Sequence, residues 1–258
     1  MNKIHRDSFP PNDPYINGPN KGRQKWRIAE NSVLKEFNHD DTNFRTGKII
    51  FNKNPSSEKW KNELIKIQGR KCCYCEKPIN TGDLEHYRPK KAWQQFKGDP
   101  VERPGYYWLA YRWKNILLAC KECNETKTKG NLFPIDGPRA FSPACNLNIE
   151  NAILINPYEE EPTQSISYYK SDPISKNDRG RQTIDLLDLK NRNDLAAIRK
   201  DRYYIFSYAK FIVDAAEKGE IELCKADFLN LKEKIRISQK EKQPFAGMIN
   251  ENIKIGHL

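Results

Sequence analysis

Four cysteines carry the clearest chemistry in this sequence, because they fall into two Cys-x-x-Cys pairs. Cys72 and Cys75 form the first pair, Cys120 and Cys123 form the second, and 44 residues lie between the pairs. A Cys-x-x-Cys turn lets two thiolates point at one ion, and two such turns complete the tetrahedral coordination of structural zinc. The spacing therefore predicts a Zn²⁺ site that stabilises the fold. The alternative is two pairs of buried free thiols.

The remaining three of the seven cysteines lack this spacing. Cys73 lies only two residues before Cys75, which is the wrong distance for a zinc turn, so Cys72 is the expected ligand and Cys73 a small buried residue. Cys145 and Cys224 stand alone and are expected to be core or surface thiols. An odd cysteine count also argues against a disulfide framework.

Between the two pairs, a carboxylate stands beside a histidine in the segment Leu84-Glu85-His86-Tyr87-Arg88-Pro89. The chain has four histidines, and only His86 lies among candidate metal ligands. Asn115 precedes an apolar run, and Asn124 directly follows the last cysteine. A histidine that is neutral near pH 7 can activate water, and a hard cation with oxygen ligands can neutralise a phosphate.

Short elements must position these residues. Apolar spacing predicts helices over 26–37 and from Ser56 or Ser57 to Gln68, with Gly69 as the stop. A strand is expected over 84–87, ended by Pro89. Neighbouring strand residues point to opposite faces, so Glu85 and His86 can converge only where the strand ends or bends. Further elements are a short strand at 49–51, a short helix at 106–113, an apolar segment at 116–119 and a polar helix starting near Asn124.

The flanking regions differ in character. Residues 1–24 are rich in Pro, Asn and Gly, including Pro11 and Pro14, and predict a loosely attached arm. Strands at 152–155 and 165–169 could pair, and helices are expected over 183–189, 195–217 and 221–238. The predicted fold class is α+β, with a small ββα zinc core between helical ends. The expected units are 1–68 (arm and helices), 69–140 (ββα-metal, treble-clef-like core) and 141–258 (helical region).

Charge and hydropathy indicate which kind of partner and which compartment to expect for this chain. The chain has 258 residues, a net charge of +11, a pI of about 9.2 and a mean hydropathy of −0.88. This balance favours nucleic acid as a partner, although a lysine-rich genome would give the same charge. The longest strongly apolar run, 116–120, is far shorter than the ~18 residues of a membrane span. No membrane partner and no signal peptide are expected, which predicts a cytoplasmic protein.

In these residues the sequence resembles the HNH endonucleases, in the form with four zinc-binding cysteines. The likeness covers 72–134, and a narrower likeness is to the HNH nucleases of Septu and retron-associated anti-phage systems. Asn156-Pro157-Tyr158 is similar to a further segment of that subgroup. The general motif consists of Cys72-x-x-Cys75, Glu85-His86, Asn115-Ile116-Leu117, Cys120-x-x-Cys123-Asn124 and Lys127. The narrower likeness adds Cys75-Glu76, Tyr87-Arg88-Pro89-Lys90, Trp113 and Gly130-x-x-Phe133-Pro134.

The resemblance implies a role for each residue. His86 would be the general base, and Asn115 would brace the turn that orients it. Glu85 and Asn124 would hold a catalytic Mg²⁺ or Mn²⁺, although the family more usually has Asp at the position of Glu85. The alternatives are a surface or zinc-associated histidine for His86, a surface acid for Glu85 and a helix N-cap for Asn124. The expected nucleic-acid contacts are Arg88, Lys90, Lys127 and Lys129.

The resemblance also implies a partner. In such defence systems the nuclease works beside an ABC-type or SMC-like ATPase, and this sequence has no Walker A motif. The C-terminal helices are the expected docking surface. The leading hypothesis is a DNA endonuclease of phage defence. Two alternatives stay open: an RNA nuclease, for example one that cleaves tRNA, and a non-catalytic zinc module that only binds nucleic acid or a partner.

Overall fold

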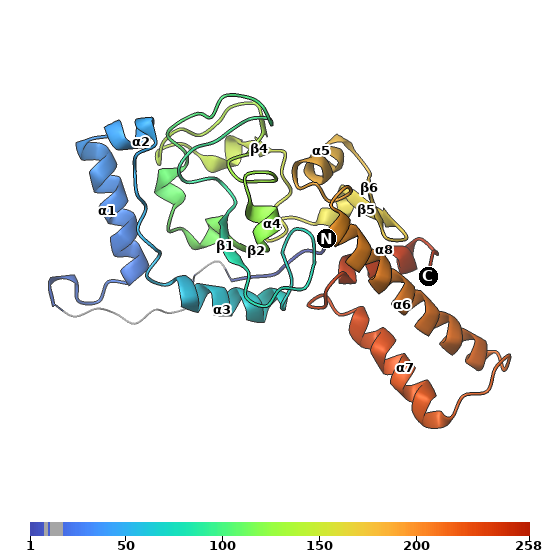
Figure 1. Cartoon of the computed structure of the whole chain (residues 1–258). Coiled ribbons are helices and arrows are strands. Elements are labelled where there is room, and N and C mark those ends of the chain that lie inside the picture. Colours follow the sequence, from blue (N-terminus) through green and yellow to red (C-terminus); the bar gives the residue numbers. More distant parts are fainter. Residues whose placement is uncertain (8–9, 11–17) are drawn as a thin grey trace.

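A two-stranded antiparallel hairpin forms the centre of the computed structural model, which describes residues 1–7, 10 and 18–258 (Figure 1). β1 (Asp83–His86) pairs with β2 (Ile116–Ala119), and His86 lies opposite Ile116. All four residues of β2 are buried, because helix and loop segments cover the strand on both faces. The predicted strand at 84–87 is confirmed with a shift of one residue, and the apolar run at 116–119 is its partner.

The helix that follows the hairpin is shorter than predicted and begins earlier in the sequence. α4 (Lys121–Asn124) is a single turn that ends at Asn124, whereas the sequence pattern placed the start of a helix there. Thr128 explains the early end, because its hydroxyl donates to the carbonyls of Glu122 and Glu125 and folds the following segment into turns. Asn124 therefore lies at a helix C-terminus, which excludes an N-cap role.

Of the three helices that precede the hairpin, α3 (Ser57–Gln68) packs on β1 and β2, whereas α1 (Lys25–His39) packs on the 3₁₀ turn at 107–109 and α2 (Thr42–Thr46) follows α1. Aromatic contacts attach them, since the ring of Trp60 lies edge-on to Trp113 with centroids 5.3 Å apart. Gly69 ends α3 as predicted, with φ at 80°, and a Cβ there would lie 2.1 Å from the carbonyl oxygen of Lys242. Residues 49–51, within the described range, form no strand.

The aromatic segment is also less regular than predicted. Two 3₁₀ turns, Tyr107–Leu109 and Trp113–Asn115, replace the single short helix expected over 106–113. Tyr107 stacks on Phe37 of α1, with ring centroids 3.9 Å apart. Packing of these large rings against α1 and α3 fixes the backbone of this segment, which the sequence pattern alone does not specify.

Two further hairpins differ in pairing from the prediction. β5 (Ile166–Tyr169) pairs with β6 (Asp172–Ser175), and β3 (Ile135–Asp136) pairs with β4 (Asn151–Ala152), so the expected pairing of 152–155 with 165–169 was wrong. The tight turn after β5 explains this result. Lys170 has φ at 53°, and the Asn252 side chain bonds both its N–H and its carbonyl. Three more 3₁₀ turns are Gly18–Asn20, Leu147–Ile149 and Pro162–Gln164.

The C-terminal region is helical, as predicted. Its helices are α5 (Asp178–Leu186), α6 (Asn193–Glu217), α7 (Lys225–Ser238) and α8 (Ala246–Lys254). α6 and α7 form a hairpin that extends away from the rest of the molecule, whereas α8 packs on β5 (Figure 1). The sequence pattern missed α8, whose N-cap Phe245 has φ at 57°. Together with the small sheets, these helices confirm the α+β class.

Met1 and Ile4 anchor the first seven residues to the core, although the sequence predicted a loosely attached arm. Met1 and Ile4 are buried, and the Ile4 N–H donates to the carbonyl of Pro157 over 2.6 Å. Arg6 donates to the carbonyls of Trp113 and Ile116, and thereby links this segment to the start of β2. Pro11 and Pro14 of the expected arm lie outside the described residues. Within those residues, no helix combines the length and the apolar character needed to cross a membrane.

Candidate functional site

The four predicted zinc ligands come together as one buried cluster. The Sγ atoms of Cys72, Cys75, Cys120 and Cys123 all lie within 4.8 Å of one another, and those of Cys75 and Cys120 are 3.8 Å apart. Four sulfurs at about 2.3 Å from a tetrahedral ion would be separated by about 3.8 Å. The donor set therefore fits a metal ion such as Zn²⁺. The cluster joins the turn before β1 to the turn after β2.

The three other cysteines lie outside this cluster. Cys73 is buried, and its N–H donates to the carbonyl of Leu118, so it fixes the first cysteine turn against β2. Cys145 is half-buried beside Ser142, and Cys224 is exposed at the start of α7. These positions agree with the sequence-based expectation that none of the three is a ligand.

His86 lies at the end of β1 and is anchored by one ring nitrogen. Its Nε2 lies 2.9 Å from the carbonyl oxygen of Ala110. A carbonyl only accepts hydrogen bonds, so Nε2 carries the proton in the neutral ring and Nδ1 keeps its lone pair. Burial, and next the positive charge of Lys90, lower the pKa of His86 to about 3. No described residue bonds to Nδ1, which leaves this atom able to accept a proton.

Asn115 braces the chain just after His86. Its Oδ1 accepts the N–H of Arg88 over 2.8 Å, and its Nδ2 donates to the carbonyls of Arg88 and Leu109. The backbone carbonyl of Asn115 also accepts the N–H of Tyr87 over 2.9 Å. A single buried amide thus holds both backbone groups of Arg88, and this fixes the direction in which β1 ends. The asparagine acts on the backbone and not on the imidazole.

Glu85 points to a different environment from that of His86. Its carboxylate forms an ion pair with Lys129, and the two side chains are 4% and 0% exposed. The Lys129 ammonium also donates to the His86 carbonyl over 2.8 Å. Burial raises the pKa of Glu85, and the lysine acts in the opposite direction. Within the described part of the chain, no hydrogen bond joins Glu85 to Asn124. This closed arrangement does not fit a divalent ion held by those two residues.

The four predicted nucleic-acid contacts differ in exposure. Lys127 is exposed on the turn after α4. Lys90 is half-buried, with its ammonium 5.2 Å from the ring centre of Phe51, and Arg88 donates to Glu150 over 2.6 Å. Lys129 is fully buried, which corrects the expectation that it reaches nucleic acid. The buried carboxylate of Glu85 needs an opposite charge beside it, and Lys129 supplies that charge in the interior, where it cannot contact nucleic acid.

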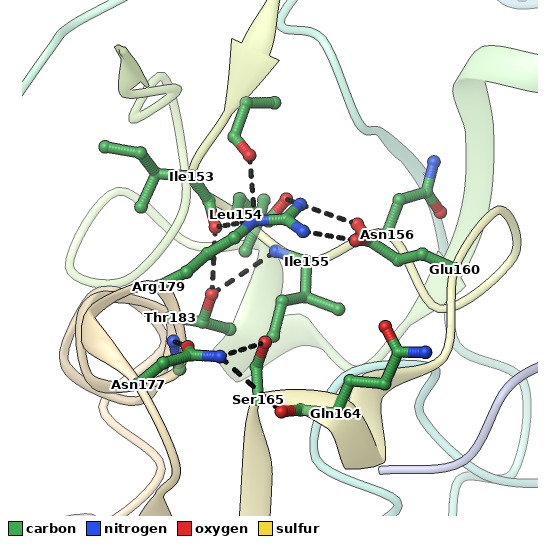
Figure 2. Close-up of polar contacts among 12 residues, drawn as sticks. Ile153, Leu154, Ile155, Asn156, Glu160, Gln164, Ser165, Asn177, Arg179 and Thr183 are labelled. Carbon is green, nitrogen blue, oxygen red and sulfur yellow. Dashed lines mark hydrogen bonds and ion pairs between the residues drawn. The ribbon is translucent and has the colours of Figure 1, made fainter.

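A cavity of about 830 Å³ borders the segment that follows His86. Arg88, Lys114 and Asn115 contribute to one wall, and Glu160 and Arg179 contribute to another. Figure 2 shows how α5 holds the second wall: Arg179 forms a bidentate ion pair with Glu160 and donates to the Ala152 carbonyl over 3.0 Å. The arrangement places two arginine–glutamate ion pairs, Arg88 with Glu150 and Arg179 with Glu160, along this cavity.

The segment around Asn156 is tied into the same wall. Thr183 of α5 donates to the Ile153 carbonyl and accepts the Ile155 N–H (Figure 2). The Asn156 N–H donates to Glu160 over 2.7 Å, so the ion pair of Glu160 with Arg179 also fixes the start of this segment. The sequence singled out residues 156–158, but neither Thr183 nor Arg179, because their roles depend on contacts between distant segments.

Arg192 is a third residue that the sequence pattern did not mark. Its Nη1 donates to the Sγ of Cys123 over 3.2 Å. Arg192 is the N-cap of α6 and lies 69 residues after that cysteine. The nearby thiols raise its pKa, against the opposing effect of burial. No local pattern marks this arginine, because the contact forms only when α6 docks on the cysteine cluster.

Comparison with known proteins gives two curated relatives. A Septu protein PtuB of Bacillus mycoides is 32% identical over 197 residues, which cover 68% of this chain and 66% of the relative. A Septu protein PtuB of Bacillus thuringiensis is 23% identical over 130 residues, covering 49% of this chain and 39% of the relative. The chain therefore spans less than two thirds of either relative. No family model and no solved structure matches it. Over the matched stretches, the chain is similar to the Septu PtuB proteins.

Proposed function

We propose that this chain is an HNH-type endonuclease that hydrolyses phosphodiester bonds in nucleic acid, as the effector of an anti-phage defence system. The observation that carries the proposal is the state of His86. Its Nε2 is held by the Ala110 carbonyl, its ring is neutral near pH 7, and no described residue bonds to its Nδ1. A fixed orientation and an available lone pair are two of the properties that a general base needs. The homology to Septu proteins supports the defence role.

In the proposed reaction, Nδ1 of His86 accepts a proton from water while the water oxygen attacks phosphorus. The bond from phosphorus to the leaving sugar oxygen breaks, and that oxygen takes a proton from solvent. The Ala110 carbonyl keeps the imidazole in the required tautomer, and Asn115 keeps the strand end in place. Lys127 is the exposed cation that can hold a phosphate oxygen. The resemblance implies Glu85 and Asn124 as ligands of a catalytic Mg²⁺ or Mn²⁺ that would add charge neutralisation. In this structure Glu85 is paired with Lys129, so these two residues do not fit that ion.

DNA is the proposed substrate, with RNA as the alternative. The net charge of +11 favours a polyanion of either kind. The cysteine cluster is proposed to bind Zn²⁺ and to hold the two ends of the β1–β2 hairpin together. The alternative hypothesis of a non-catalytic zinc module predicts the same cysteine cluster, but it gives His86 no role in function.

The proposed partner is an ABC-type or SMC-like ATPase that docks on the outer face of α6. Ile205, Tyr208 and Phe211 project from this face and are 63%, 64% and 68% exposed. Residues at such spacing share one side of a helix, and large exposed apolar side chains in a row typify contact surfaces. In Figure 1 the α6–α7 hairpin extends away from β1, the strand that ends at His86.

The test compares wild type with His86→Ala and with His39→Ala, a matched change at an exposed histidine. Each protein is incubated with plasmid DNA and with total RNA, in Mg²⁺ or Mn²⁺, with and without the ATPase partner. Cleavage by wild type and His39→Ala, but not by His86→Ala, supports the nuclease. The nucleic acid that is cut distinguishes DNA from RNA. Equal behaviour of all three proteins, with zinc still bound, would favour the non-catalytic module.

A further inference from the structure

Three oxygen atoms surround the buried ammonium of Lys129. One belongs to the Glu85 carboxylate, the second is the His86 carbonyl oxygen at 2.8 Å, and the third is the Gly130 carbonyl oxygen at 3.5 Å. Lys129 is fully buried, and the Glu85 side chain is 4% exposed. One carboxylate with two carbonyls is also a typical oxygen set for a hard divalent cation. The chain thus builds a cation site and fills it with its own lysine.

The site cannot hold two cations at once. Divalent ions bind oxygen ligands at about 2.0 to 2.6 Å, so an ion bound to Glu85 and the His86 carbonyl would overlap the position of the ammonium. Two positive charges at that distance repel strongly in a buried site. A buried carboxylate left without any cation is also unfavourable. Binding of a divalent ion and docking of Lys129 therefore exclude each other.

We propose that Lys129 is the resident cation of this oxygen site, and that a divalent cation binds to Glu85 only when the ammonium withdraws. The proposal rests on the proposed function in one respect, since it concerns the carboxylate expected to hold the catalytic ion. Lys129 thereby lowers the divalent affinity of the chain, because only the fraction of molecules with a withdrawn lysine can bind. It also links the state of this site to His86, whose carbonyl it holds.

A second buried pair provides a matched control. Lys71 donates to Glu76 over 2.6 Å, and both side chains are 2% exposed, much like Lys129 and Glu85. Glu76 keeps a second partner if Lys71 is removed, since it also accepts the Gly247 N–H over 3.0 Å. Lys71→Met therefore removes a buried ion pair without opening the oxygen site. It reports what loss of a buried lysine does by itself.

The experiment measures Mn²⁺ binding to the zinc-loaded protein without chelator, from the electron paramagnetic resonance signal of free Mn²⁺, with thermal melting in parallel. Lys129→Met is expected to bind one Mn²⁺ at least about tenfold more tightly than wild type, and to gain thermal stability from it. Lys71→Met is expected to bind like wild type. The double variant Glu85→Gln/Lys129→Met is expected to lose the gain. Lys129→Gln, which keeps a donor for the His86 carbonyl, replaces Lys129→Met if the latter does not fold.

Equal Mn²⁺ affinity of wild type and the folded Lys129 variant would overturn the proposal, and so would a gain that survives in the double variant. Either result leaves the proposed nuclease intact, because that function is judged separately by cleavage in wild type and His86→Ala. Conversely, a wild type that cuts no nucleic acid would reject the nuclease while leaving the Mn²⁺ result valid.

Discussion

Arg192 of α6 donates a hydrogen bond from Nη1 to the Sγ of Cys123 over 3.2 Å. Four thiolates around one Zn²⁺ carry a net negative charge, which a guanidinium partly neutralises. Beside it, Lys77 bridges Glu122 of α4 and Asp194 of α6. The long C-terminal helix is therefore attached at its N-terminus to the cysteine cluster, through charged groups from two regions of the sequence.

Arg192→Gln is expected to weaken zinc binding. Removal of an outer partner of a metal ligand typically reduces affinity by roughly 10- to 100-fold. The affinity is measured by competition with a chromophoric zinc chelator. Arg236→Gln serves as the control, because Arg236 lies on the exposed surface of α7 and pairs only with Glu233. Equal zinc affinity of the two variants would show that the contact with Cys123 adds nothing.

Cys120→Ser is expected to abolish zinc binding and cooperative unfolding. Structural zinc in small sites contributes about 10 kcal/mol or more of apparent binding free energy, and the cysteine cluster joins both ends of the β1–β2 hairpin. Zinc content by mass spectrometry and thermal melting by circular dichroism measure the loss. Cys224→Ser, at an exposed thiol, is expected to match wild type in both. Full zinc content in Cys120→Ser would contradict the assigned ligand set.

His86→Ala is expected to reduce cleavage by roughly 10²- to 10⁴-fold, the usual contribution of a general base. Its zinc content should stay unchanged, because His86 is not among the cluster residues. Rates are measured on a labelled duplex under single-turnover conditions, with His39→Ala as the matched control. A rate for His86→Ala within twofold of wild type would remove the histidine from the mechanism.

The free energy of unfolding of the wild type is expected to decrease as the pH is lowered, because of His86. Burial, and then the charge of Lys90, hold its folded-state pKa at about 3, below the ordinary value of about 6.5 for the unfolded chain. Between these values the unfolded state binds more protons, so stability decreases as the pH falls from 6.5 toward 3. Urea unfolding of wild type and His86→Gln over this range tests the effect. A constant difference between the two proteins would contradict it.

Asn115→Ala is expected to destabilise the fold by about 1 to 3 kcal/mol, because the buried N–H and carbonyl of Arg88 would lose their partners. Urea unfolding gives the free energy change. Asn115→Asp keeps the acceptor for the N–H but loses the donor, so an intermediate loss is expected. Wild-type stability of both variants would show that water replaces the amide.

Two substitutions on the outer face of α6, Ile205→Asp and Tyr208→Glu, are expected to reduce binding of the ATPase partner by at least about tenfold. Thermal stability should change little, since both side chains are mostly exposed. Isothermal titration with the purified partner measures the affinity, and Ile174→Asp on exposed β6 is the control. Unchanged affinity would move the docking surface elsewhere.

The sequence by itself indicated the four cysteines that cluster, the α+β class and most of the helices. Two Cys-x-x-Cys turns are local structures whose chemistry requires nothing beyond spacing, and α1, α3, α6 and α7 follow from apolar periodicity, whereas the pattern missed α2. The strand before Pro89 was equally local. Each of these features depends on residues close together in the chain, which is why a pattern could reveal them.

Tertiary structure decided the rest. The partner of β5, the one-turn length of α4 and the existence of α8 depend on contacts such as that of Asn252 with Lys170. The same holds at the candidate site, where burial turns Lys129 from an expected phosphate contact into the partner of Glu85. A charge moved out of water must find an opposite charge wherever the fold supplies one, and spacing along the chain does not specify that location.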